Sequence, residues 1–242
     1  METSPLKARL RSLLDLARER QLAQVAGLPA SERDATGTLE RWTAKDHLAH
    51  TIFWKEYMSE RLAAAERGET PVLIPDYQPV NEANFLVNRD RHWVDLLAAD
   101  ARVHAELLAR LDALEEDNLV DPERYSWRKG EPLVLFVLGN SFWHAQEHLA
   151  QYLSDRGDLD AATQTHETFV RETTSSSLPT IAHAYAVYNL ACFYATTGRK
   201  EQALTNLAEA LRLRPALAEW SQQDPDFATL RDEPGYQQLY TG

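Results

Sequence analysis

The chain has 242 residues and a formal net charge of −12, with 25 Lys and Arg against 37 Asp and Glu. This length allows one large or two small domains, and the acidic balance argues against nucleic-acid partners, whose phosphates are bound by clustered Lys and Arg. The single cysteine, Cys192, excludes a disulfide framework. No signal peptide and no apolar run of the ~20 residues that span a bilayer are recognised, so we expect a cytoplasmic protein outside the membrane.

Two helices are predicted in the first 65 residues. Residues 4–27 begin with a serine and a proline, which is a favourable helix start, and leucines then recur at helical spacing. Residues 43–65 begin with a threonine followed three residues later by an aspartate, the spacing of a capping box. This second helix carries His47 and His50 near its start.

Two more helices are predicted. Over residues 93–114 apolar residues follow the helical period, and the helix over residues 132–156 is apolar almost all round at first, which indicates a central position. Three prolines over residues 71–79 predict a loop, and residues 116–131 are acidic and rich in turn formers. Because no segment alternates like a strand, the fold class that we expect is all-α: an up-down four-helix bundle over residues 1–156.

Residues 157–242 have a different pattern, typical of a short tetratricopeptide-like helical tail. Six residues match the small, aromatic and terminating positions of one repeat over residues 182–215, namely Leu190, Tyr194, Gly198, Ala203, Ala210 and Pro215. A similar glycine-to-alanine spacing from Gly157 indicates a degenerate repeat before it. Such a tail is suited to recruiting a peptide or protein partner, or a second copy of the chain as a homodimer.

His144 and His148 lie on one face of the fourth helix, because four residues advance a helix by almost one turn. With Glu147 they satisfy the pattern H-x-x-E-H of one class of zinc peptidases. Those enzymes need a further glutamate ligand from a larger α+β scaffold, and no strands are predicted here. The simple alternative is a pair of boundary histidines on a long helix.

His50 favours a metal site over that alternative. An antiparallel neighbour would bring it opposite His144 and His148, and a catalytic site with open positions usually has three protein ligands. Three neutral imidazoles suit zinc, nickel or iron(II), and we expect zinc or nickel. The sequence assigns neither a catalytic residue nor an organic cofactor.

Three stretches in this order resemble the DinB-like four-helix bundles, and within them most the ClbS/DfsB branch: RWTAKDHLAHTIFWKEYMSERL, VNEANFLVNRDRHWVDLLAADARVHAELLARLDAL and VLGNSFWHAQEHLAQYL. The resemblance covers residues 4–156. In metal-binding members of that superfamily, one histidine comes from the second helix and an H-x-x-x-H pair from the fourth. The resemblance therefore implies a divalent metal on His50, His144 and His148.

The activities that the resemblance implies are thiol-dependent transfer, isomerisation and a self-protecting hydrolysis. We therefore expect a hydrolase or thiol-dependent transferase that acts on a small electrophilic or toxic molecule. The alternative is a non-catalytic ligand- or protein-binding module with a tetratricopeptide tail. Hydrolysis of a strained ring without metal, which the ClbS resemblance permits, is a third possibility.

The other notable side chains receive simpler interpretations. His47 is expected to face solvent, with a role beside the ligands as the alternative. Trp54 either packs against the fourth helix or lines a pocket, and Asn140 is a candidate for orienting a water or a ligand. His104 is expected at the edge of the core and Cys192 as a buried, inert thiol. No role is assigned to His92, His166 and His183.

Overall fold

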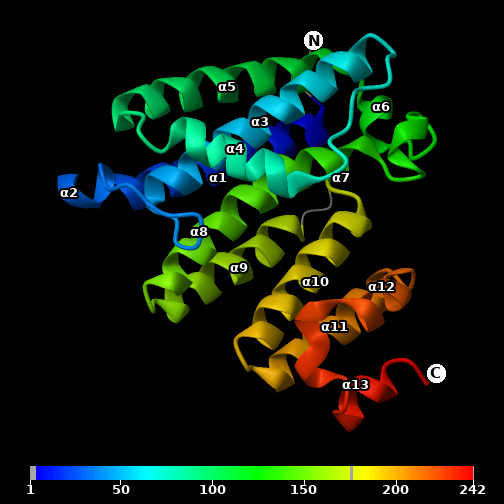
Figure 1. Cartoon of the computed structure of the whole chain (residues 1–242). Helices are drawn as coiled ribbons and strands as arrows, with labels where there is room; N and C mark the ends of the chain where they lie inside the picture. The colour runs from blue at the N-terminus through cyan, green and yellow to red at the C-terminus, as the bar shows by residue number, and fades with distance from the viewer. Residues whose placement is uncertain (1–3, 175–176, 242) are drawn as a thin grey trace. The chain divides into compact units, whose positions relative to one another are not determined.

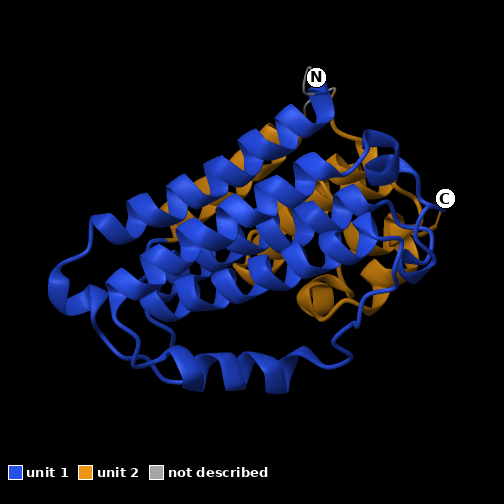
Figure 2. Ribbon diagram, turned by 90° about the horizontal axis from the view of Figure 1, so that it is seen from above, with its two compact units in different colours: residues 1–158 blue, residues 159–242 orange. Residues whose placement is uncertain are grey.

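Residues 4–174 and 177–241 are described in a computed structural model of the chain, and all their regular elements are helical (Figure 1). An isolated bridge between Thr38 and Arg41 is the one strand-like pairing in these ranges. The chain divides into two compact units, unit 1 (Met1–Asp158) and unit 2 (Leu159–Gly242), coloured separately in Figure 2. None of the described helices combines the length and apolar character that crossing a bilayer requires.

Unit 1 is a bundle of four long helical segments that run side by side (Figure 2). Helix α3 packs against α5 and α8, and α1 packs against α5 and α8. The core between them consists largely of leucine side chains that are inaccessible to solvent. The all-α bundle prediction is confirmed, and its long segments are α1 (Pro5–Ala26), α3 (Ala44–Glu66), α5 (Trp93–Ala113) and a fourth rod made of α7 (Leu133–Val137), the π-helical η2 (Leu138–Trp143) and α8 (His144–Asp155).

The start of α3 is fixed by the predicted capping box. The Asp46 backbone N–H donates to Thr43 Oγ1 at 3.3 Å, and the Thr43 N–H donates to Asp46 Oδ2 at 2.8 Å. Gly37 lies against this cap, where an added Cβ would collide with Asp46 Oδ2. Because the two amides at the helix end have partners inside the protein, the first turns of α3 can be buried at little cost in hydrogen bonding.

The prediction of a loop over residues 71–79 is wrong at its end, because α4 (Tyr77–Asn88) includes residues 77–79. Pro79 lies in the first turn of α4, where a backbone amide has no helical partner to lose. The Asp76 carboxylate caps the helix by accepting from the Gln78 N–H at 3.1 Å. The remaining short elements of unit 1 are α2 (Ala30–Arg33), α6 (Glu116–Val120) and η1 (Ser126–Arg128).

The predicted helix over residues 132–156 is present, but η2 interrupts its α-helical hydrogen bonding. A π-helical turn holds more residues than an α-helical turn, so it rotates all that follows around the helix axis. Such insertions are frequent at functional sites. Here the insertion ends directly before His144 and therefore sets the face on which α8 carries its histidines.

Unit 2 is built from helices that share a second apolar core. Gly198 forms the turn between α10 and α11 with a φ of 78°, a left-handed conformation that favours glycine. Leu190, Tyr194, Ala203 and Ala210 are buried in this core. Helix–turn–helix pairing is the layout that a tetratricopeptide repeat requires, and that assignment stays a prediction. The elements are α9 (Leu159–Thr173), α10 (Thr180–Thr196), α11 (Lys200–Leu213), α12 (Leu217–Gln223), η3 (Pro225–Leu230) and α13 (Pro234–Gln238).

Candidate metal centre

The first turns of α3 bring two histidines into the interior of unit 1. His47 is 5% exposed and His50 is 3% exposed. Three residues advance a helix by about 300°, so the two rings share one face of α3. That face is turned toward α8, against which α3 packs.

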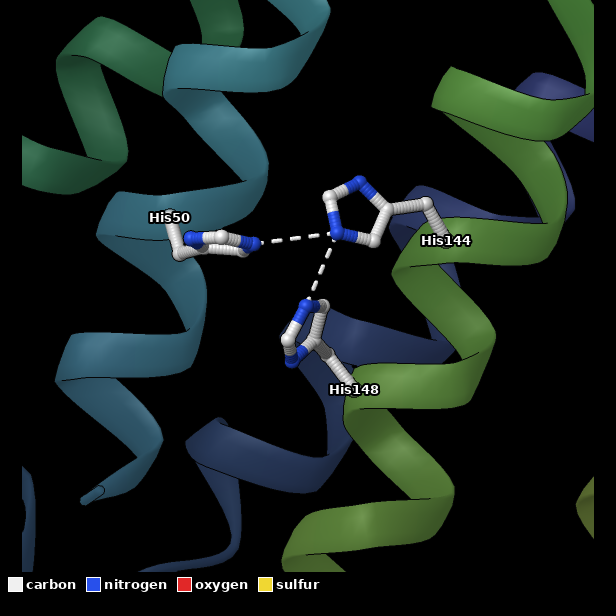
Figure 3. Close-up of side chains that lie close together, drawn as sticks. All are labelled: His50, His144 and His148. Carbon is white, nitrogen blue, oxygen red and sulfur yellow. Dashed lines mark hydrogen bonds between the residues drawn. The ribbon is translucent and has the colours of Figure 1, made fainter. Parts of the chain in front are cut away.

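On α8, His144 and His148 are partly buried and lie one turn apart. Figure 3 shows the three predicted ligands, with His50 extending from α3 toward the pair on α8. The Nε2 atoms of His50 and His144 are 3.0 Å apart, and those of His144 and His148 are 2.8 Å apart. The structure thus brings together the three side chains that the sequence predicted as ligands, each by its Nε2 atom.

A shared divalent cation accounts for the close approach of the three nitrogens better than hydrogen bonds between the rings do. Nε2 of His144 faces two other Nε2 atoms, whereas a neutral imidazole nitrogen carries either one proton or one lone pair. Both contacts cannot therefore be well-aligned hydrogen bonds. Tetrahedral zinc at about 2.0–2.1 Å from each nitrogen would hold its ligands roughly 3.3 Å apart, which requires His144 Nε2 to move from its two neighbours by only a few tenths of an ångström.

The electrostatics of the centre keep these rings neutral. Burial lowers the pKa of His50 to about 2, and the nearby His144 and His47 rings add to this shift. Burial also lowers the pKa of His144 to about 4, with a further contribution from the Lys55 ammonium. The pKa of His148 is lowered well below its usual value, again mainly by burial. Neutral imidazole is the form that binds a metal, so the centre is in its binding form at neutral pH.

The expectation that His47 faces solvent is wrong. Its Nδ1 atom lies 3.0 Å from Nδ1 of His148, and its Nε2 atom is buried with no described hydrogen-bond partner. Burial lowers the pKa of His47 to about 4. His47 and His50 stand three residues apart, a spacing that shares a helix face, and this was the signal in the sequence for a fourth histidine at the centre.

Trp42 was missed by the sequence reasoning. Its ring is stacked on His148 at a centroid distance of 5.7 Å and an interplanar angle of 14°, and it lies 4.9 Å from the ring of His50. Phe85 of α4 stacks on Trp42 at 6.3 Å. Because Trp42 precedes the cap of α3, no helical periodicity indicated where its ring would lie.

A pocket of about 490 Å³ opens onto the three predicted ligands. Trp42 forms an apolar part of its wall, and the carboxylates that line it belong to Glu82 and Glu147. The amides of Gln78, Asn81 and Gln151 complete the polar lining. No lysine or arginine is among these lining residues, so a ligand in the pocket would meet neutral and acidic groups beside the three histidines.

Other residues singled out in the sequence do not line this pocket. Trp54 packs 6.0 Å from the ring of His144 and donates from Nε1 to Asn81 Oδ1 at 3.1 Å, which ties α4 to α3. Asn140 donates to the Phe136 carbonyl at 3.1 Å, within its own helical rod. His104 is 7% exposed and lies 2.7 Å from Asp15 Oδ1, at the edge of the core as predicted.

A second group of potential ligand atoms lies in unit 2, where Cys192, Asp224 and Asp226 come within 4.8 Å of one another. Cys192 is only partly buried, in contrast to the buried thiol that the sequence indicated. Its thiol donates to Asp224 Oδ2 at 3.9 Å, and the Tyr188 hydroxyl donates to the same oxygen at 2.7 Å. These hydrogen bonds already engage the Asp224 carboxylate, so the group is explained as packing within unit 2.

The helical bundle and its histidine centre define a class of all-α proteins with a potential metal site between two helices. A model of the DinB superfamily matches residues 13–152, which is more than half of the chain. The chain belongs to the DinB superfamily. No curated protein and no solved structure matched it in the corresponding comparisons.

Proposed function

We propose that His50, His144 and His148 bind one divalent ion, zinc or nickel, and that the protein uses it on a small electrophilic or toxic molecule. The convergence of three Nε2 atoms, from buried His50 and partly buried His144 and His148, at a pocket is the observation that supports this most directly. The reaction would be hydrolysis or a thiol-dependent transfer. The resemblance to the ClbS/DfsB branch supports a protective role against a reactive molecule.

A bound divalent ion would supply Lewis-acid chemistry, polarising an electrophile and lowering the pKa of a water or thiol beside it. The protein side chains fill three positions, so the side open to the pocket remains for substrate. Trp42 stacks on one face of the His148 ring, and an apolar ring in that position would lower the local dielectric and strengthen the attraction between the ion and its ligands.

Glu147 is the carboxylate that we assign to proton transfer. It lines the same pocket as the three ligands and follows His144 by three residues on α8. A carboxylate that does not itself bind the ion can accept a proton from a nucleophile in the pocket. Glu82, on the exposed side of α4, lines the pocket as well and provides a matched comparison. Changing Glu147 to Gln should leave metal binding intact and abolish any hydrolysis.

The alternative function is a non-catalytic binding module. The pairing of α10 with α11 around Gly198 supports it, because stacked helical pairs bind peptides and proteins on their faces. In that case unit 2 recruits a partner, and the pocket of unit 1 sequesters a ligand without converting it.

Metal content separates the two functions. Protein purified without added ions should contain close to one zinc or nickel per chain by elemental analysis, and protein with His144 changed to Ala should contain almost none. A metal-free preparation that also fails to take up zinc and nickel would contradict the enzyme and leave the binding module. Hydrolysis of a strained ring without metal would survive that result and would then be tested with the metal-free protein.

A further inference from the structure

His47 is a fourth imidazole in the centre, and the proposed set of three ligands gives it no role. Its ring is buried beside Trp42, at a centroid distance of 5.3 Å, and beside Tyr152, at 6.0 Å. Its Nδ1 atom lies 3.0 Å from Nδ1 of His148, whereas the other ring nitrogen of His148, Nε2, faces His144. The four rings are therefore linked through consecutive nitrogens, from α3 to α8 and back to α3.

The protonation of the two rings determines which Nδ1 atom donates and which accepts in this contact. A neutral imidazole that binds a metal through Nε2 has its single proton on Nδ1 and must donate it to an acceptor. The hydrogen-bonding atom found next to Nδ1 of His148 is Nδ1 of His47. For His47 to accept there, its own proton has to lie on Nε2, so one arrangement of protons satisfies the contact between the two Nδ1 atoms and places the His47 N–H on a buried nitrogen with no described partner.

We propose that His47 is a positioning residue that accepts a hydrogen bond from Nδ1 of His148 and thereby holds Nε2 of His148 toward the metal. This inference rests on the proposed metal centre and extends it to a residue outside the ligand set. Helix α3 then supplies both one ligand, His50, and the group that orients a ligand on α8. The contact of His50 with His144 and the contact of His47 with His148 both connect α3 to α8.

The identity of the acceptor has a chemical consequence. Metal-binding histidines usually donate their second N–H to a carboxylate, a backbone carbonyl or water, and a carboxylate increases the basicity of the ligand. A neutral imidazole orients the ring without adding a negative charge. The centre would therefore retain more of the positive charge of the ion, which favours polarisation of an electrophile.

The test compares two changes at residue 47. His47→Leu removes the acceptor and keeps an apolar side chain, whereas His47→Asn keeps a side-chain oxygen near the position of Nδ1. Loss of the group that orients a metal ligand typically weakens metal binding about 10- to 100-fold. We expect that loss in His47→Leu and recovery to within about threefold of wild type in His47→Asn. Tyr152→Phe, beside the same ring, is the matched control and should bind metal like wild type.

Zinc affinity is measured by competition with a chelating dye, and cobalt(II) spectra report the ligand geometry. His47→Leu should broaden and shift the cobalt absorption bands, and His47→Asn should restore them. Melting curves without metal show whether each variant folds. In the zinc-loaded wild type, 15N spectra of the imidazoles should show His148 with its proton on Nδ1.

Equal zinc affinity in wild type and His47→Leu would overturn the inference and leave the metal centre standing. Equal weakening in the Leu and Asn variants, with equal melting temperatures, would show that His47 acts by packing and would also overturn it. If the wild type binds no metal, both this inference and the proposed function are wrong. These three results are distinguishable within one set of titrations.

Discussion

Buried histidines occur in both units, but their surroundings differ. In unit 1, four imidazoles turn nitrogens toward one another across α3 and α8. In unit 2, His166 of α9 is stacked on Phe193 at 4.3 Å, and its Nδ1 atom has no described hydrogen-bond partner. Burial lowers the pKa to about 4 both for His166 and for His144. A lowered pKa therefore does not identify a metal site; the facing nitrogens do.

The largest expected effect is on zinc binding, when one histidine of each unit is changed to alanine and the two variants are compared. His144→Ala deletes the central ligand and should raise the Kd for zinc at least a thousandfold, which corresponds to about 4 kcal/mol. At a hundredfold excess over Kd, zinc should add ~2.7 kcal/mol to the stability of wild type and almost nothing to this variant. His166→Ala should lower the stability of the chain and leave the zinc-dependent gain unchanged. Melting curves with and without zinc measure both, and a lost gain in His166→Ala would contradict the distinction.

The next largest effect is the loss of stability at acidic pH that His166 of unit 2 causes. Because the pKa of His166 is about 4 in the folded protein and ~6.5 in the unfolded chain, the unfolded state takes up a proton first as the pH falls. The free energy of unfolding should therefore decrease between about pH 6.5 and pH 4, by on the order of 3 kcal/mol for this residue. His166→Met removes the titrating group and keeps an apolar side chain beside Phe169 and Phe193, which both contact the His166 ring. Urea unfolding at pH 7, 5.5 and 4.5 should show a smaller loss in this variant than in wild type.

The sequence predicted the helices of unit 1 and the convergence of His50, His144 and His148 because both depend largely on local rules. A threonine and an aspartate three residues apart specify the start of α3 through backbone hydrogen bonds between near neighbours. The spacing of His144 and His148 follows from helix geometry alone. The facing histidine, His50, was found from the start of its helix and from the resemblance to a bundle family.

The missed features depend on more than local rules. Residues 133–138 are apolar throughout, so the extra residue in the π-helical turn leaves no change of phase in the sequence pattern. The burial of His47 depends on how α3 is rotated against α8, which the period of one helix does not determine. The position of Trp42 depends on the loop before the cap and on the packing of Phe85 from a helix that was predicted as a loop in part.

A smaller effect is expected from the aromatic wall of the centre. Trp42 stacks on His148, and such aromatic pairs contribute about 0.5–1.5 kcal/mol beyond the area that they bury. Trp42→Ala should therefore weaken zinc binding about 3- to 10-fold and make the His148 ring more mobile. Phe193→Ala removes the equivalent stacking from His166 in unit 2 and should not alter zinc binding. Isothermal titration of the two variants compares them directly, and equal affinities in Trp42→Ala and wild type would show that the wall does not support the ligand.

The smallest expected change is the response of zinc affinity to mild acid. For exposed histidines with a pKa of ~6.5, protons at pH 5 would weaken metal binding by about 30-fold for each ligand. In this centre burial lowers the pKa of His50 to about 2 and that of His144 to about 4, so protons do not compete at pH 5. The Kd of the folded protein for zinc should therefore change less than about threefold between pH 7 and pH 5. The titration is made with circular dichroism at each pH, because the apo protein loses stability as the unfolded histidines take up protons below pH 6.5. A steep loss of affinity while the helical signal is unchanged would mean that the three rings are hydrated in solution, and the low-dielectric centre proposed for this pocket would be wrong.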